Sequence, residues 1–152
     1  MEPIQATCVV YTTLITMKYA FEDCFGSRVR SLSRKIDGIY RKHLGDAGIT
    51  ENQLSIMMAL YKTGRIEQNV IGGFLNLEKS SLSRNLVRLI KMNLIKKDGP
   101  VNRPLIGLTE PGRHEVERLT PRWEAAMDEI SAVLDMEGVK GFGTFEKQLS
   151  KL

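Results

Sequence analysis

The chain has 152 residues, 42% of them hydrophobic and 26% charged, with a formal net charge of +4 at pH 7. This composition is that of a soluble globular domain with a real core, which excludes the disordered and fibrous classes. No run reaches the roughly 18 apolar residues of a membrane helix. No basic segment precedes the apolar residues 8–17 as in a signal peptide, so we expect a cytoplasmic protein. Cys8 and Cys24 are too few for a disulfide scaffold and match no zinc motif.

Residues 1–20 fit two interpretations. Val9, Val10, Leu14 and Ile15 favour a partly buried helix or strand that covers a second subunit, because these side chains would otherwise be exposed. A poorly ordered terminus explains the same residues equally well.

Residues 25–44 form the first clear helical pattern, with an apolar stripe from Val29 to Leu44. The rest of this helix carries Arg28, Arg30, Arg34, Lys35, Arg41 and Lys42. These side chains can touch phosphate, but the ordinary interpretation of such a charge run is a solvated helix face.

A second helix is predicted from Thr50, which can cap it, to Thr63 and Gly64. Gln53 stands three residues after Thr50 and completes a capping box. The residues that we expect to bury this helix are Leu54, Met57, Met58, Leu60 and Tyr61.

Residues 66–97 carry the main signal of the chain, which is a helix, a tight turn, a second helix and a strand. The apolar stripes of the two helices are Val70, Ile71, Phe74 and Leu75, and then Leu82, Leu86, Leu89 and Ile90. We expect the turn at Asn76, because asparagine tolerates a left-handed backbone, and Leu77 can fill the angle between the helices. Gly72 and Gly73 leave room for the second helix to approach.

The second of these helices, starting at Glu78 or Lys79, has a polar outer face. Short hydroxyl side chains near its start let the backbone approach a major groove, and arginine or asparagine can then reach bases. The face consists of Lys79, Ser80, Ser81, Ser83, Arg84, Asn85 and Arg88, with Lys91 one turn further on. It suits DNA, although a solvated surface with serines that cap the helix fits the same residues.

A hairpin, or wing, is predicted next, with strands at residues 94–97 and 103–108 around a turn at Asp98, Gly99 and Pro100. Asn93 can end the preceding helix in a left-handed conformation. Over residues 78–103, seven basic and two acidic residues give a net charge of +5, where the whole chain has +4. The positive charge is therefore concentrated on the helix and hairpin that would read DNA.

Two further helices complete the chain. Thr109 can cap a long helix that has Pro111 in its first turn. Residues 110–137 contain eight acidic and three basic residues, so we expect this helix to face away from DNA. The last segment has Phe142, Phe145 and Leu149 at helical spacing. Packing against a partner chain would explain how so glycine-rich a helix stays folded.

An ordered set of motifs extends from Ile49 to Ile130. The motifs are Gly48-Ile49-Thr50, Gln53-Leu54, Ile71, Leu75-Asn76-Leu77, Lys79-Ser80-Ser81-Leu82-Ser83-Arg84, Leu94-Ile95 and Leu108-Thr109-Glu110-Pro111-Gly112-Arg113. This set resembles the MarR family of winged helix-turn-helix transcriptional regulators. That family usually has Asp-x-Arg at the wing tip, where this chain has Val101, Asn102 and Arg103.

The resemblance implies a mainly α fold with a small β-hairpin wing, organised as one MarR-like domain. Residues 1–48 would be an N-terminal segment and dimerisation helix, residues 49–109 the winged helix-turn-helix DNA-binding lobe, and residues 110–152 the C-terminal dimerisation helices. It also implies a sequence-specific regulator of transcription that binds double-stranded DNA without a cofactor or metal, and a repressor, because relatives mostly repress. The DNA-binding residues would be Lys79, Ser80, Ser81, Ser83, Arg84, Asn85, Arg88, Lys96, Lys97, Asn102 and Arg103.

A homodimer is expected on physical grounds too, because two recognition helices in successive major grooves read an inverted repeat. In the resembling family an effector pocket forms between the dimer helices and the DNA-reading lobe. Met57, Met58 and Tyr61 would lie there and contact a small apolar or phenolic effector, although methionines of this kind more often fill a core.

Other hypotheses stay open. Peroxide-sensing relatives carry a cysteine near the position of Cys24, which predicts an oxidant-sensing regulator, whereas an inert thiol is the ordinary alternative. A winged helix can also be a protein-docking module without DNA affinity. We expect no enzyme, because the sequence has no phosphate loop, metal-ligand cluster or paired nucleophile and base, and His43 and His114 are isolated.

Overall fold

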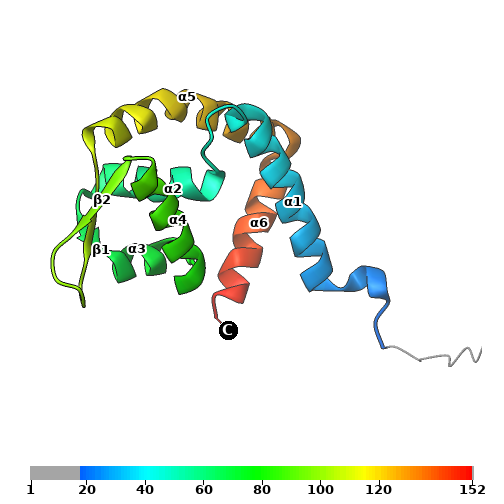
Figure 1. Ribbon diagram of the computed structural model, residues 1–152. Helices are drawn as coiled ribbons and strands as arrows, with labels where there is room; N and C mark the ends of the chain where they lie inside the picture. Colours follow the sequence, from blue (N-terminus) through cyan, green and yellow to red (C-terminus); the bar gives the residue numbers. More distant parts are fainter. Residues whose placement is uncertain (1–17, 152) are drawn as a thin grey trace, which may run out of the picture. The chain divides into compact units, whose positions relative to one another are not determined.

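The computed structural model describes residues 18–151. They divide into two compact units, the first ending at Ser33 and the second beginning at Arg34. The elements are η1 (Phe21–Asp23), α1 (Phe25–Leu44), α2 (Glu51–Thr63), β1 (Ile66–Glu67), α3 (Gln68–Phe74), α4 (Lys79–Lys91), β2 (Ile95–Asp98), β3 (Leu105–Leu108), α5 (Glu110–Val133) and α6 (Met136–Leu149) (Figure 1). The expectations about residues 1–17, Cys8 included, lie outside the described residues.

Local capping explains why several helices begin where the sequence predicts. The Thr50 hydroxyl accepts a hydrogen bond from the Gln53 amide at 3.3 Å, and the Gln53 side chain accepts one from the Thr50 amide at 3.0 Å. The capping box before α2 is thus confirmed. At the start of α5 the Thr109 hydroxyl accepts from the amide of Gly112 at 3.1 Å, with Pro111 in the first turn as expected.

The tight turn between α3 and α4 forms at Asn76, whose φ is +50°. The amide of Leu77 donates to the carbonyl of Gly72 at 3.0 Å, which closes the turn. A Cβ at Gly72 would lie 3.1 Å from the Leu82 side chain, so α4 does approach closely there. Gly73 has nothing within 4 Å of such an atom, and the expectation that it makes room for α4 is wrong.

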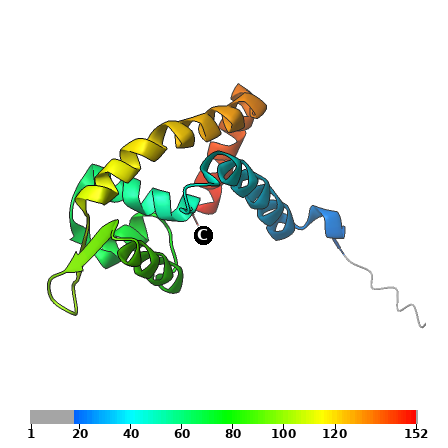
Figure 2. The same ribbon diagram turned by 45° about the horizontal axis from the view of Figure 1, so that its top comes forward.

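The sheet has three antiparallel strands in the order β1-β3-β2, one more than the predicted hairpin. β2 and β3 form the wing, with Ile95 opposite Leu108 and Asp98 opposite Leu105. Residues 66 and 67, which we predicted as the start of a helix, instead pair with β3 as the short strand β1. The fold is therefore mainly helical with a small sheet, in the winged helix-turn-helix arrangement that the sequence predicts, and Figure 2 shows the wing loop extending past the helices beside it.

One core joins α2, α3, α4, α5 and the sheet of the second unit. Its fully buried large side chains are Leu54, Ile56, Met57, Leu60, Ile71, Leu89, Ile95, Ile106 and Leu119. Several apolar residues that we expected to be buried are exposed instead, namely Val29 and Leu32 on α1, Tyr61 on α2, Val70 and Phe74 on α3, and Ile90 on α4. α3 has only seven residues and buries just Ile71 and Gly72, so its other apolar side chains stay on the surface.

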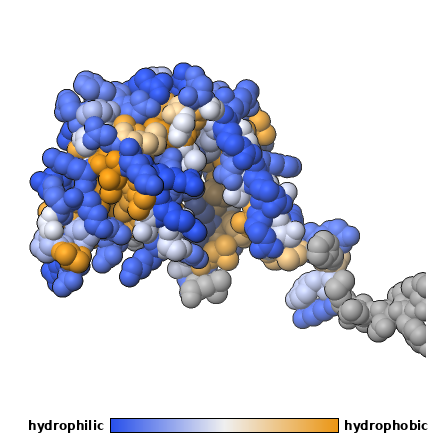
Figure 3. All heavy atoms as spheres, viewed as in Figure 1, coloured by the Kyte–Doolittle hydropathy of each residue, from blue (hydrophilic) through white to orange (hydrophobic). Residues whose placement is uncertain are grey.

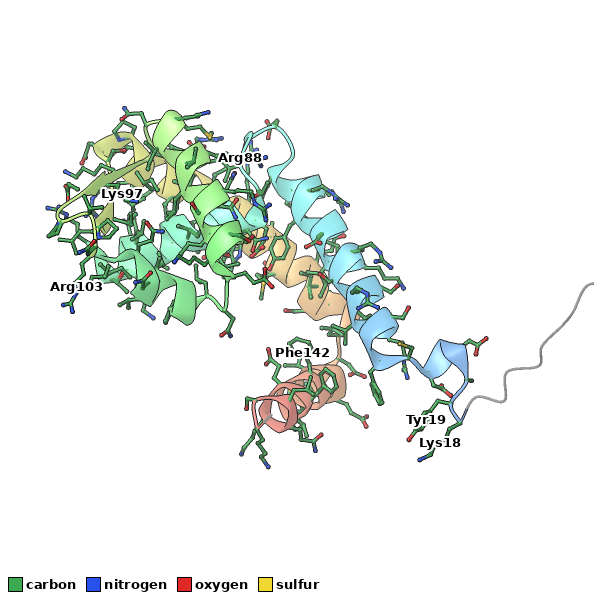
Figure 4. The ribbon with its side chains drawn as sticks, turned by 60° about the horizontal axis from the view of Figure 1, so that its bottom comes forward. Lys18, Tyr19, Arg88, Lys97, Arg103 and Phe142 are labelled. Carbon is green, nitrogen blue, oxygen red and sulfur yellow. The ribbon has the colours of Figure 1, made fainter. Side chains whose placement is uncertain are left out.

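Helix α6 has no buried residue, although it carries a regular apolar face. Val139, Phe142 and Leu149 are all exposed, and Figure 4 shows Phe142 on this helix. The Asp135 side chain caps α6 by accepting from the Gly138 amide at 2.7 Å. Among residues 18–151, no helix is both long enough and apolar enough to cross a membrane.

Candidate nucleic-acid interface

Helix α4 presents one face to the core and the other to solvent. Leu82, Leu86 and Leu89 are buried and fix the rotation of the helix. The exposed residues on its other side are Lys79, Ser80, Ser83, Arg84, Arg88 and Lys91, while Ser81 and Asn85 are half-buried at its edge. The sequence therefore predicts the exposure of six of these eight residues correctly, because the leucine spacing sets the outward face.

The serines of α4 do not cap the helix. Its N-cap residue is Glu78, whose side chain accepts no hydrogen bond from the first turn. The amides of that turn and the hydroxyls of Ser80 and Ser83 are thus available to a ligand, and the helix dipole there favours an anion. Asn85 differs, because its side-chain amide donates to the carbonyl of Ser81 at 3.1 Å and lies along the helix.

The wing carries the remaining predicted DNA-binding residues. Lys96 and Lys97 are exposed on β2, and Asn102 and Arg103 are exposed in the loop beyond it. Gly99 makes the reversal with a φ of +87°, a left-handed backbone that favours glycine. Figure 4 shows Lys97 and Arg103 on the wing and Arg88 on α4.

An ion pair that the sequence does not predict fixes the end of β2, where the wing loop begins. Arg65, just before β1, pairs with Asp98 at the end of β2. Its aliphatic stem also lies over Gly107, where an added Cβ would be 2.6 Å from Cγ of Arg65. No local sequence signal marks this pair, because its members are separated by 33 residues.

The cations of α4 and the wing have no acidic partner. Among the ion pairs of the described residues, none includes Lys79, Arg84, Arg88, Lys91, Lys96, Lys97 or Arg103. These side chains form a cluster of unneutralised positive charge, which we call the basic face. Such a cluster attracts a polyanion at long range.

The acidic helix α5, in contrast, uses several of its charges internally. Glu115 pairs with Arg118 at 2.6 Å, and Arg122 pairs with Asp46. The hydrogen bond from Arg118 lowers the pKa of Glu115, and that from Arg122 lowers the pKa of Asp46. Part of the charge of α5 is therefore neutralised within the fold.

A hollow of about 710 Å³ lies between α2, α3 and α5. Its lining is mostly apolar and consists of Ser55, Met58, Ala59, Tyr61, Lys62, Phe74, Leu75, Val116, Glu117, Thr120, Pro121 and Trp123. Of the three expected pocket residues, Met58 and Tyr61 line it. Met57 is fully buried in the core, because adjacent residues of a helix point in different directions.

Tyr61 is the best-defined polar group at this hollow. Its hydroxyl donates to Glu117 at 2.9 Å, and the Arg113 guanidinium lies 5.9 Å from the centre of its ring. The hydrogen bond to Glu117 raises the pKa of Tyr61. The hollow thus combines an aromatic and apolar lining with one oriented phenol, which suits a ring-shaped ligand.

Cys24 lies just before α1 and has a free, exposed thiol. It lines a surface hollow in the first unit together with Tyr19, Asp23 and Arg28. The oxidant-sensor hypothesis therefore stays a prediction. Among the described residues, no group of histidine, cysteine or acidic side chains is placed to hold a metal ion.

A sequence model of the MarR family matches residues 49–100, which extend from the cap of α2 to the turn after β2. The match thus covers both helices of the helix-turn-helix and the first strand of the wing. No curated protein matches the chain by sequence.

Several solved structures share the fold over most of the chain. BpsR of Bordetella bronchiseptica, whose DNA binding is regulated by 6-hydroxynicotinic acid, aligns with 18% identity and a TM-score of 0.80 over 90% of this chain and 100% of that one. The PcaV transcriptional regulator of Streptomyces coelicolor, solved with its natural ligand, aligns with 19% identity and a TM-score of 0.78 over 90% and 98%. MepR of S. aureus, solved with DNA, aligns with 24% identity and a TM-score of 0.72 over 84% and 98%.

Proposed function

We propose that this chain, whose residues 49–100 match a model of the MarR family, is a member of that family. It would be a sequence-specific regulator that binds double-stranded DNA through α4 and the wing. The family consists of transcriptional regulators and not of enzymes. α4 would lie in the major groove and the wing would contact the neighbouring backbone and minor groove. Acting on chromosomal DNA, the protein would work in the cytoplasm.

The basic face carries this proposal. Its seven cations have no acidic partner among the described residues, and they flank exposed hydroxyls at the uncapped start of α4. Phosphate contacts need free cations and free amides, and base contacts need side chains such as Arg84 at the groove floor. A protein-docking surface has no need for so many unneutralised charges, because interface cores are depleted of them.

Selection of bound sequences from random double-stranded DNA tests the proposal, followed by affinity measurements on the selected site and on a scrambled one. We expect a clear preference for the selected site, and a loss of roughly 10³-fold in affinity between about 50 and 200 mM salt. Arg88→Ala should weaken binding, whereas Lys147→Ala on α6 should not. Equal affinity for both sites would contradict the proposal, and no binding at low salt would favour the docking module.

We further propose that the protein acts as a homodimer on an inverted repeat. The exposed apolar face of α6, with Val139, Phe142 and Leu149, supports this, since a face of this kind on a stable helix is normally covered. Sedimentation of the full chain should give twice the monomer mass. Phe142→Asp should shift it toward the monomer, and an unchanged mass for that variant would contradict a dimer through α6.

The hollow between α2, α3 and α5 supports a small apolar or phenolic effector that releases the protein from DNA, as a repressor requires. In BpsR a small aromatic acid, 6-hydroxynicotinic acid, regulates DNA binding. That compound is a suitable first probe. We expect an aromatic ligand to lower DNA affinity if it binds more tightly to a dimer shape that does not fit DNA. Trp123→Ala should abolish the response and leave DNA affinity without ligand unchanged. A response that survives in this variant would place the effector elsewhere.

A further inference from the structure

Val87 is an apolar residue in the middle of the basic face. It lies on α4 with its side chain 49% exposed, and it directly precedes Arg88, which Figure 4 labels. Residues three and four positions apart are neighbours on a helix surface, so its side chain adjoins Ser83, Arg84, Ile90 and Lys91. The exposed side of α4 is therefore mixed, because Val87 and the less exposed Ile90 lie beside cations and a hydroxyl.

The fold gives no reason for a valine at this position. The core contact of α4 is made by Leu82, Leu86 and Leu89, which lie on its other side. A β-branched residue is also a weaker helix former than lysine, glutamate or alanine, and those residues suit an exposed helix position better. Single exposed apolar residues are common on proteins, so exposure alone carries no argument. Val87 differs from such residues because it lies among groups that would contact DNA.

The major groove offers one apolar group to a protein, which is the C5-methyl group of thymine. A valine side chain has no hydrogen-bonding atom, so this methyl group is the feature of a base edge that it can recognise. Arginine reads a different feature, since it donates to the acceptors of guanine. Val87 and Arg84 together would distinguish two kinds of base pair from one face of the helix.

We propose that Val87 reads the C5-methyl group of a thymine in each half-site. The proposal rests on the proposed function, because it needs α4 in the major groove. Three residues of helix advance by about 4.5 Å, close to the spacing of about 3.4 Å between base pairs along one strand. The thymine should therefore occupy a position next to the base pair that Arg84 reads.

The test replaces single thymines of the selected site by deoxyuridine, which removes only the methyl group. At one position per half-site, we expect the unaltered protein to lose roughly fourfold in affinity, the effect of one buried methyl group. In Val87→Ala that position should lose its sensitivity to deoxyuridine, while the other thymines behave as before. Alanine is a good helix former, so α4 stays intact in this variant.

Val70→Ala is the matched control, because Val70 is 56% exposed on α3 and lies outside the basic face. It should keep the full deoxyuridine effect. If no thymine is sensitive in the unaltered protein, or if Val87→Ala keeps the same sensitivity, the inference is overturned while the proposed function stands. If the protein binds no DNA with sequence preference, both are overturned together.

Discussion

Arg65 and Asp98 form an ion pair that ties the end of strand β2 to the segment before β1. Both side chains are about half-exposed, so the pair adds little to global stability, typically about 0–1 kcal/mol. Its effect is local, because it neutralises the one acidic group of the wing and fixes the end of β2, where the wing loop begins. Lys97, next to Asp98, therefore projects from a strand whose loop end is anchored.

We predict that Arg65→Ala lowers DNA affinity several-fold, because Asp98 is then an unpaired anion beside the phosphates. The double variant Arg65→Ala with Asp98→Ala should recover part of the loss. Titration of a selected DNA site measures both. If the double variant binds no better than Arg65→Ala alone, Arg65 contacts DNA directly and the ion pair is not the cause.

Gly112 in the first turn of α5 sits against the backbone of the loop before the wing. A Cβ at this position would collide with the carbonyl oxygen of Leu94, which also accepts a hydrogen bond from the Thr109 amide at 3.1 Å. We predict that Gly112→Ala destabilises the protein by about 1–3 kcal/mol, the usual effect of overpacking. Thermal unfolding measures this difference.

Gly73→Ala is the control for that variant, because an added Cβ there meets nothing within 4 Å. Alanine is the better helix former, so α3 should gain up to about 1 kcal/mol. Equal losses of stability in the two variants would show that close approach at Gly112 is not the cause.

The sequence is most informative where the determinants of structure are local. Asn76 and Asn93 adopt the positive φ values that their positions predict, and Thr50 and Thr109 cap helices α2 and α5. Each of these features depends on a few neighbouring residues. For the same reason, the leucine spacing of α4 is enough to identify its exposed face.

The sequence does not reveal features that depend on contacts between residues far apart along the chain. Strand β1 exists because Ile66 and Glu67 pair with β3, whereas its own sequence predicts the first turn of a helix. Arg65 was overlooked because its partner is distant along the chain. The pocket shows the same limit, since hydrophobicity alone does not tell that Met58 lines it while Met57 fills the core.

Arg84 and Lys97 should contribute differently to binding, because one lies on the helix and the other on the wing. We predict that Arg84→Ala relaxes sequence preference at one position, with about 1–3 kcal/mol lost on the best site. Lys97→Ala should weaken binding to all sequences alike. It should also reduce the slope of log affinity against log salt concentration by about one, because one phosphate contact is lost. Parallel affinity measurements on the selected and scrambled sites distinguish the two patterns, and a sequence-specific loss in Lys97→Ala would contradict this division.

Glu129 on α5 joins that helix to the end of α1. One oxygen, Oε2, lies 2.8 Å from Lys42 Nζ and 2.7 Å from His43 Nε2. The hydrogen bond from Lys42, followed by that from His43, lowers the pKa of Glu129. A carboxylate whose pKa is lower in the folded state contributes stability above the unfolded-state pKa, which for glutamate is about 4.3, and loses it as the pH falls through the lowered folded-state value.

We therefore predict that Glu129→Gln is less stable than the unaltered protein at neutral pH, and that the difference shrinks as the pH falls from about 5 toward about 3. Unfolding by denaturant across this range measures the two curves. Glu124→Gln is the matched control, because Glu124 is exposed on the same helix and forms no ion pair among the described residues. Its curve should run close to that of the unaltered protein. A difference between Glu129→Gln and the unaltered protein that stays constant with pH would mean that Glu129 acts through packing and not through its charge.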